Sequence, residues 1–176
     1  HGDEVVFSEN GFLRFKLGAI SCGATPVSAK EVKHTTSVDA LLASVTDRTK
    51  VVLLANPNNP TGTYVPTGEL ERLWAGLPPT VLLVIDSAYA EFVESADYSS
   101  GEALVGRSEN VVMTRTFSKA YGLAGVRVGW AYGSERVIET FNRARLPFPV
   151  SGAAQAAGVA ALQDEAHLRA VIGHNT

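Results

Sequence analysis

The sequence lacks most of the features that mark several large classes of protein. Cys22 is the only cysteine in 176 residues, which excludes an internal disulfide framework and a cysteine-rich metal site. No apolar run reaches the roughly 18 residues that a membrane span needs. Lys and Arg total 15 against 18 Asp and Glu, and they are scattered, so no basic stripe is available for a nucleic-acid backbone. We therefore expect neither a membrane nor a nucleic acid as a partner.

Motifs for other ligands are also missing. There is neither a G-x-G-x-x-G turn after a predicted strand nor a Walker A loop, which disfavours a nucleotide-binding α/β domain. The histidines inside the chain, His34, His167 and His174, show no metal-type spacing with one another or with carboxylates. We interpret them as surface or helix residues and expect no metal site.

What is present is the composition of a folded domain, 45% hydrophobic and 19% charged. Short apolar runs rich in β-branched residues predict six strands, at Glu4–Phe7, Thr25–Ser28, Val51–Ala55, Val81–Ile85, Val111–Thr114 and Val128–Tyr132. Helical patterns lie between them, at Phe12–Ala19, Val38–Val45, Thr67–Ala75, Glu135–Arg143 and Ser151–Gln163. Thr67 is expected to cap the third helix. The alternation predicts an α/β fold with three layers, α/β/α, around a mainly parallel sheet.

Polar segments follow three successive predicted strands. The segment NPNNPTG comes directly after the third strand, DSAY lies at the end of the fourth, and TFSK lies just beyond the fifth. In an open parallel sheet, ligands bind outside the carboxyl ends of the strands. We therefore expect Asn59, Asp86, Tyr89 and Lys119 to meet at one edge of the sheet.

Each of these residues also has an ordinary structural interpretation when it is taken alone. Asp86 could cap a following helix, and Tyr89 could be a packed aromatic side chain. Lys119 could be a surface lysine at a helix start. The segment NPNNPTG could be a pair of consecutive turns.

The combination is more specific than its members. Lys119 lies in a run that is poor in charge, and a lysine in apolar surroundings is a candidate nucleophile for a carbonyl carbon. Arg127 carries a fork that suits two phosphate oxygens, and Thr116 and Ser118 add hydroxyl groups. A planar pyridinium with an aldehyde, a phenolate oxygen and a phosphate would use all of these groups together with Asp86. That ligand is pyridoxal 5′-phosphate.

The segments NPNNPTG, DSAYAEF and TFSKAYGLAGVRVG resemble the three cofactor motifs of the fold-type I pyridoxal-phosphate-dependent aminotransferases, within them the histidinol-phosphate aminotransferase branch. The similarity runs from Asp3 to about Leu168. It implies the large cofactor-binding domain of that fold, in an incomplete form. The implied activity is amino-group transfer between histidinol phosphate and 2-oxoglutarate in histidine biosynthesis, in the cytoplasm.

The resemblance also implies roles for individual residues. Lys119 would bind the cofactor as a Schiff base and later move a proton between the substrate's α-carbon and the cofactor. Asp86 would pair with the pyridine nitrogen, while Asn59 and Tyr89 would bond the ring hydroxyl oxygen.

The remaining implied roles concern the phosphate and the ring face. Thr116, Ser118 and Arg127 would hold the phosphate. Phe12, in the segment SENGFLRF, aligns with an aromatic residue that stacks on the pyridine ring. Phe15 lies close by in the sequence, and either phenylalanine could instead belong to the core.

Two departures from the family pattern stand out. Ser87 replaces the glutamate of the more common Asp-Glu-Ala-Tyr, and we expect cofactor binding to survive this change. The family is also about twice as long as this chain. We therefore expect residues 1–146 to be part of the large domain and residues 147–176 to be a helical segment leading toward a missing small domain. The isolated chain should be inactive and at best a weak cofactor binder, whereas the full-length protein should be a homodimer.

Other functions remain open at this point. An aromatic amino acid aminotransferase or a phosphothreonine-type decarboxylase on the same fold would carry the same cofactor residues. A protein of another class, the aminotransferase-like sensory domain of a transcription regulator, would bind the cofactor without turnover. Such regulators carry a basic winged-helix region ahead of this domain, and none is visible in the sequence.

Overall fold

A computed structural model describes residues 2–175 of the chain. Its centre is a sheet of six strands: β1 (Glu4–Ser8), β2 (Thr25–Ala29), β5 (Thr49–Ala55), β6 (Leu82–Asp86), β7 (Val111–Thr116) and β8 (Gly129–Gly133). The strand order is β2-β1-β5-β6-β7-β8, and every neighbouring pair is parallel except β7 and β8. The predicted strands and the mainly parallel sheet are thus confirmed, and the differences are confined to the strand ends.

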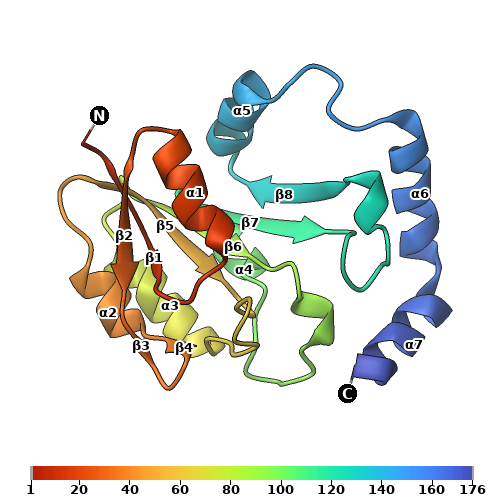
Figure 1. Ribbon diagram of the computed structural model, residues 1–176, viewed down its shortest axis with the longest axis horizontal. Helices are drawn as coiled ribbons and strands as arrows, with labels where there is room; N and C mark the ends of the chain where they lie inside the picture. The colour runs from red at the N-terminus through yellow and green to blue at the C-terminus, as the bar shows by residue number, and fades with distance from the viewer. Residues whose placement is uncertain (1, 176) are drawn as a thin grey trace.

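Helices flank both faces of this sheet (Figure 1). They are α1 (Leu13–Ser21), α2 (Val38–Ala43), α3 (Thr67–Gly76), α4 (Glu102–Val105), α5 (Glu135–Ala144), α6 (Gly152–Gln163) and α7 (Glu165–Asn175), with the 3-10 turns η1 (Ala90–Phe92) and η2 (Ala124–Val126). Five of the helices match the predicted ones. The sequence analysis did not anticipate α4 or a small hairpin of β3 (Glu31–Val32) and β4 (Thr35–Thr36), whereas α7 lies within residues 147–176, which were expected to be helical.

The main core lies on the face of the sheet covered by α2, α3 and α4. Alternate residues of the central strands, such as Leu54 and Ile85, are almost completely buried there. The opposite face is covered by α1, where Phe15 packs edge-on against Phe7 of β1 at 6.5 Å between ring centroids. The helix α5 packs against β8 on this second face. The expected three layers are therefore present.

The start of α3 differs from the expectation. Pro66 occupies the N-cap position in an extended conformation, and Thr67 is already helical. The Thr67 hydroxyl donates to the carbonyl of Asp97 at 2.7 Å instead of accepting from the first turn of the helix. The backbone amide of Thr67 donates to the same carbonyl. A tertiary contact therefore replaces the predicted cap.

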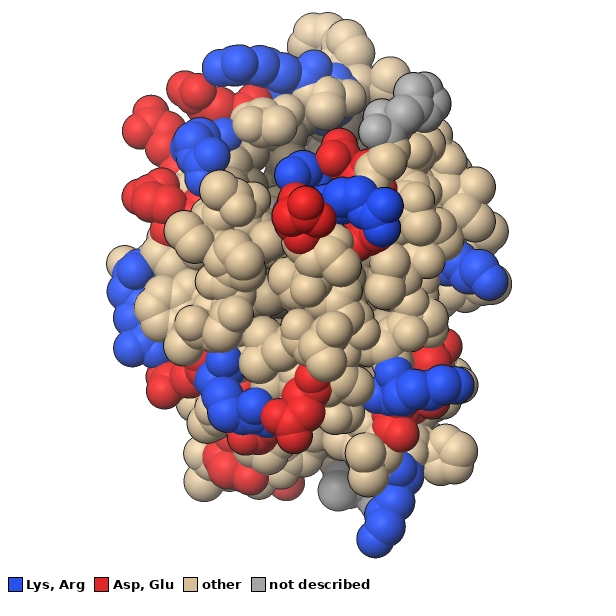
Figure 2. Space-filling view, turned by 90° about the vertical axis from the view of Figure 1, so that its left-hand side faces the viewer, with Lys and Arg blue, Asp and Glu red and all other residues tan. Residues whose placement is uncertain are grey.

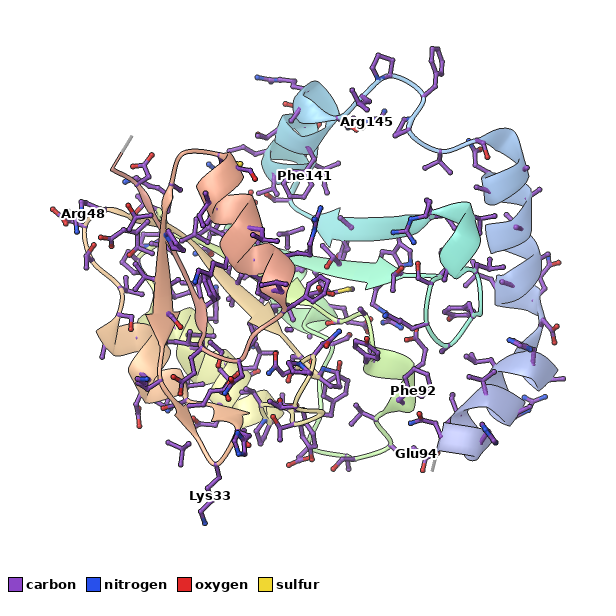
Figure 3. All side chains as sticks on the ribbon, viewed as in Figure 1. Lys33, Arg48, Phe92, Glu94, Phe141 and Arg145 are labelled. Carbon is purple, nitrogen blue, oxygen red and sulfur yellow. The ribbon has the colours of Figure 1, made fainter. Side chains whose placement is uncertain are left out.

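The last two helices lie beyond the carboxyl end of β7, along one side of Figure 1. The helix α6 contacts η2 and α7 contacts η1. Phe92 of η1 and Glu94 lie next to α7 in the side-chain view (Figure 3). The loop before α6 exposes Phe148, which is 96% accessible. Among the described residues, no helix is long and apolar enough to cross a membrane.

Charged side chains of both signs share the surface. Figure 2 shows Lys and Arg lying next to Asp and Glu around a central uncharged area on one face of the molecule. The ion pairs of Arg72 with Asp39 and with Glu69, on the exposed sides of α2 and α3, are an example of this mixing.

One carboxylate is buried at the amino end of the sheet. Glu4 is 3% exposed and accepts hydrogen bonds from Thr46 Oγ1 at 2.6 Å and from the guanidinium of Arg48. Arg48 lies at the outer edge of the molecule, on the side opposite α6 and α7 (Figure 3). The hydrogen bond from Thr46, followed by those from Arg48 and Thr49, lowers the pKa of Glu4 against the opposing effect of burial.

This arrangement predicts an acid-sensitive contribution to stability. A carboxyl with a lowered pKa stabilises the folded state above its unfolded pKa of about 4.5, and that contribution is lost as pH falls through the folded value. We expect Glu4→Gln to lower the free energy of unfolding at neutral pH and to have a smaller effect near pH 3. Urea denaturation at both pH values measures this. Glu165→Gln, which removes an exposed ion pair with Arg169, is the control, and an equal pH response in both variants would contradict the prediction.

Candidate functional site

A cavity of about 360 Å³ opens at the carboxyl ends of β5, β6 and β7. This volume is in the range of small-molecule pockets. All eight residues predicted for the site line it: Phe12, Asn59, Asp86, Tyr89, Thr116, Ser118, Lys119 and Arg127. The register of the sheet explains this convergence, because Asp86 pairs with Ala55 of β5 on one side and with Thr114 of β7 on the other. The strand ends therefore reach the cavity side by side.

Asp86 is the last residue of β6 and is largely withdrawn from solvent. Its Oδ1 accepts a hydrogen bond from the amide of Ala88 at 3.2 Å. Burial raises the pKa of this carboxyl, and the hydrogen bonds from Ala88 and Thr114 and the charge of Lys119 oppose the rise only in part. A cationic group placed beside Asp86 would therefore be stabilised by it.

Tyr89 links two of the strand ends. The Asn59 side-chain amide donates to the Tyr89 hydroxyl at 3.1 Å, which joins the loop after β5 to the turn after β6. Lys119 Nζ lies 4.9 Å from the centroid of the Tyr89 ring. Lys119 is exposed, although Phe117 and Ala120 in the same segment are buried. Its side chain is therefore not enclosed in the apolar surroundings expected for it, and it lines the cavity against the face of the Tyr89 ring.

Hydroxyl groups and a guanidinium gather on the segment that follows β7. The Ser118 amide donates to Thr116 Oγ1 at 3.1 Å, which shapes the turn. Arg127 Nη1 donates to the Ala124 carbonyl at 2.7 Å and contacts Ser118 Oγ at 3.4 Å. Arg127 also has a left-handed backbone with φ of 54°, an uncommon conformation for a residue other than glycine. The chain therefore holds this guanidinium close to the Ser118 hydroxyl group, and Thr116 lines the same cavity.

The two phenylalanines have separate positions. Phe12 occupies the N-cap position of α1 and lines the cavity, whereas Phe15 packs between Phe12 and Phe7. The ring centroids of Phe12 and Phe15 are 5.9 Å apart, with an interplanar angle of 85°. Phe12 is thus the phenylalanine that faces the cavity, because it stands just before the helix and not within it.

The sequence analysis missed other residues of the cavity wall, including Ala55, Thr114 and Arg115. Arg115 lies between Thr114 and Thr116 at the end of β7, directly before the segment TFSK. This position in the sequence could have indicated that Arg115 also lines the cavity. Ser87, which departs from the family pattern, is completely buried and donates to the Ser100 carbonyl at 2.8 Å, away from the cavity lining. Among residues 2–175 no cluster of three or more His, Cys, Asp or Glu could hold a metal ion.

Comparison with known proteins shows the family of this chain. Residues 1–172 match the aminotransferase class I and II family, and the chain belongs to that family. The histidinol-phosphate aminotransferase of Rhodospirillum centenum is 61% identical over 163 residues, which cover 93% of this chain and 45% of the relative. That of Paramagnetospirillum magneticum is 56% identical over 174 residues, which cover 99% and 48%. The chain therefore spans about half the length of the curated relatives it matches.

Solved structures show the same fold. The histidinol-phosphate aminotransferase of Sinorhizobium meliloti in complex with pyridoxal-5′-phosphate has a TM-score of 0.91 and 34% identity, covering 97% of this chain and 46% of that one. The aspartate aminotransferase from Rhizobium meliloti has a TM-score of 0.86 and 26% identity, covering 98% and 46%. The resemblance seen in the sequence and its α/β fold are thus confirmed.

Proposed function

We propose that this chain forms the pyridoxal 5′-phosphate site of an aminotransferase that transfers an amino group between histidinol phosphate and 2-oxoglutarate in histidine biosynthesis. The observation that carries the proposal is the convergence of eight predicted residues on one cavity. The choice of substrate is supported by relatives that are named histidinol-phosphate aminotransferase and are 51% to 61% identical.

The residues present fit this cofactor. Asp86 is a partly desolvated carboxylate, so a protonated pyridine nitrogen would supply the cation that it lacks. Asn59 Nδ2 and the Tyr89 hydroxyl offer donors for a ring oxygen. Thr116, Ser118 and Arg127 offer two hydroxyl groups and a guanidinium for a phosphate dianion. The cavity also presents the ring of Phe12, which we assign to the face of the pyridine ring.

The chemistry follows from these positions. When bound, pyridoxal 5′-phosphate supplies an electron sink for negative charge at the carbon that bears the amino group. Lys119 would hold the cofactor through its aldehyde and, as a free amine once the substrate's amino group has displaced it, its Nζ would accept and return the proton at that carbon. Asp86 keeps the proton on the ring nitrogen. Arg127 and Ser118 anchor the phosphate, so that the reacting carbon stays within reach of Lys119.

The organisation of the whole protein is part of the proposal. We assign residues 1–146 to the large cofactor-binding domain and residues 147–176 to a segment that leads toward a second domain. The assignment is supported by the coverage of the relatives, of which the chain spans only 45% to 48%. We further propose that the complete protein is a cytoplasmic homodimer. The isolated chain binds the cofactor weakly and does not turn over.

A panel of amino donors with the full-length protein tests this function. With 2-oxoglutarate as acceptor, we expect histidinol phosphate to give the highest kcat/KM. Turnover of aromatic amino acids without histidinol phosphate would instead indicate an aromatic aminotransferase, and release of carbon dioxide would indicate a decarboxylase. Cofactor binding without turnover would favour a sensory domain. Turnover by the 176-residue chain alone at about 1 per second would refute the assignment of an inactive fragment.

A further inference from the structure

One ion pair stands between the motifs of the site. The guanidinium of Arg115, in β7, pairs with the carboxylate of Glu91, in η1. The Arg115 and Glu91 side chains are only 18% and 7% exposed. Arg107 and Glu71, by contrast, form an ion pair with both side chains about half exposed. Water and salt therefore screen the Arg115–Glu91 pair far less than a surface pair.

The position of this pair connects two segments that line the cavity. Glu91 comes two residues after Tyr89, and Arg115 comes directly before Thr116. The pair bridges η1 and β7, so it links the turn that carries Tyr89 to the segment that carries Lys119. The separation of 4.9 Å between Lys119 Nζ and the Tyr89 ring lies across the same two segments.

The third motif, NPNNPTG, also has contacts with the segment that follows η1. The Tyr98 hydroxyl donates to the carbonyl of Asn56, the first residue of NPNNPTG, at 2.8 Å. Burial raises the pKa of Tyr98 to about 12, and the charges of Arg115 and Glu91 act on this pKa in opposite directions. The segment NPNNPTG is also joined to the turn that carries Glu91, because the Asn59 side-chain amide donates to the Tyr89 hydroxyl.

The orientation of Arg115 is restrained from a further side. Its Cζ lies 5.8 Å from the ring centroid of Trp130, its register partner on β8. Arg115 Nε is buried and has no hydrogen-bond partner among the described residues. A buried donor without a partner opposes stability, so this arrangement is not explained by the stability of the fold alone.

We propose that the Arg115–Glu91 ion pair is a positioning device for the cofactor site. The ion pair holds the turn that carries Tyr89 in place relative to the segment from Thr116 to Lys119. It acts through these residues and contributes no reacting group. The inference rests on the proposed function, because it needs a cofactor for the site to hold.

The test measures cofactor binding by single and double variants of the full-length protein. We expect Glu91→Gln and Arg115→Met each to raise the Kd for pyridoxal 5′-phosphate about tenfold, and the double variant to raise it no further, because the two residues act as one unit. The induced circular dichroism of the bound cofactor's visible band should also change, since it reports the orientation of the ring. This measurement is made well below the unfolding temperature, where a purely structural loss of stability would not alter the band.

The chain offers a matched control. Arg107 pairs with Glu71 and lies 5.3 Å over the ring of Trp74, so it reproduces the same ion pair and aromatic contact outside the cavity. Arg107→Met and Glu71→Gln should leave the Kd within about twofold of wild type. Arg115→Lys keeps the charge and should recover part of the affinity, and it serves as the second variant where Arg115→Met does not fold.

The outcomes separate the two proposals. Wild-type affinity in both Glu91→Gln and Arg115→Met overturns the positioning role while the proposed function stands. Weak binding by Arg115→Met but not by Glu91→Gln also overturns it, because Arg115 would then act on the cofactor directly. Absence of binding in the wild-type full-length protein overturns the proposed function and the positioning role together.

Discussion

Lys119→Ala is expected to abolish the borohydride-stable attachment of pyridoxal 5′-phosphate to this chain. A Schiff base forms only with an amine at the cavity, and Lys119 is the lysine among the residues that line it. In the full-length protein the same change should lower kcat by about 10⁴-fold, because it also removes the group that moves the proton. Noncovalent binding should persist, since the phosphate and ring contacts remain.

Peptide mapping after borohydride reduction measures the first effect. The labelled peptide should contain Lys119 in the wild-type chain and should disappear in the variant. Lys50→Ala is the control, because Lys50 lies on β5 near its amino end, away from the cavity. A label that stays at full yield in Lys119→Ala would show that another amine binds the cofactor and would remove Lys119 from its assigned role.

The strand pattern and the site could be predicted from the sequence for one reason. Buried parallel strands are continuous apolar runs, and a motif at the end of such a run must emerge at one edge of the sheet. Asp86 illustrates this, because it ends the run VLLVID and its place at the cavity follows directly. Arg127 could be placed only with the phosphate chemistry in mind, since its left-handed backbone leaves no trace in the apolar pattern.

The features that were missed depend on tertiary contacts. The helix α4 has four residues and the hairpin of β3 and β4 has two residues in each strand, so neither carries a full period of apolar residues. The Thr67 hydroxyl turns to Asp97, thirty residues away in the sequence. The Arg115–Glu91 pair joins residues that are 24 positions apart, and neither residue alone predicts its partner.

Asp86→Asn is expected to have opposite effects on the empty and the loaded protein. Burial raises the pKa of the Asp86 carboxyl, so the folded chain holds this proton more tightly than the unfolded chain does. The folded state therefore loses stability as pH rises above 3.8, the ordinary pKa of an aspartate. The whole of this destabilisation is present once pH exceeds the pKa of Asp86 in the folded chain. Asparagine carries no charge, so the cofactor-free variant should unfold at a higher temperature than wild type at neutral pH.

When the cofactor is bound, Asp86→Asn is expected to be harmful and no longer stabilising. An amide cannot keep a proton on the pyridine nitrogen, so Asp86→Asn should weaken the stabilisation of developing charge and lower kcat of the full-length protein by about 10²–10³-fold. Added cofactor should therefore raise the unfolding temperature less in the variant than in wild type. Asp47→Asn, which alters an exposed aspartate outside the cavity, should change neither quantity.

The two effects together distinguish a site carboxylate from a structural one. A carboxylate that served mainly to hold the turn after β6 would lose stability on conversion to asparagine, with or without cofactor. A buried carboxylate that binds a cationic ligand destabilises the cofactor-free fold and stabilises the protein only when the cation is bound. Scanning calorimetry with and without pyridoxal 5′-phosphate measures the change in unfolding temperature of Asp86→Asn in both states. Destabilisation of the cofactor-free variant at neutral pH would show that the hydrogen bond from Ala88 outweighs the burial of the charge, and Asp86 would then be a structural residue.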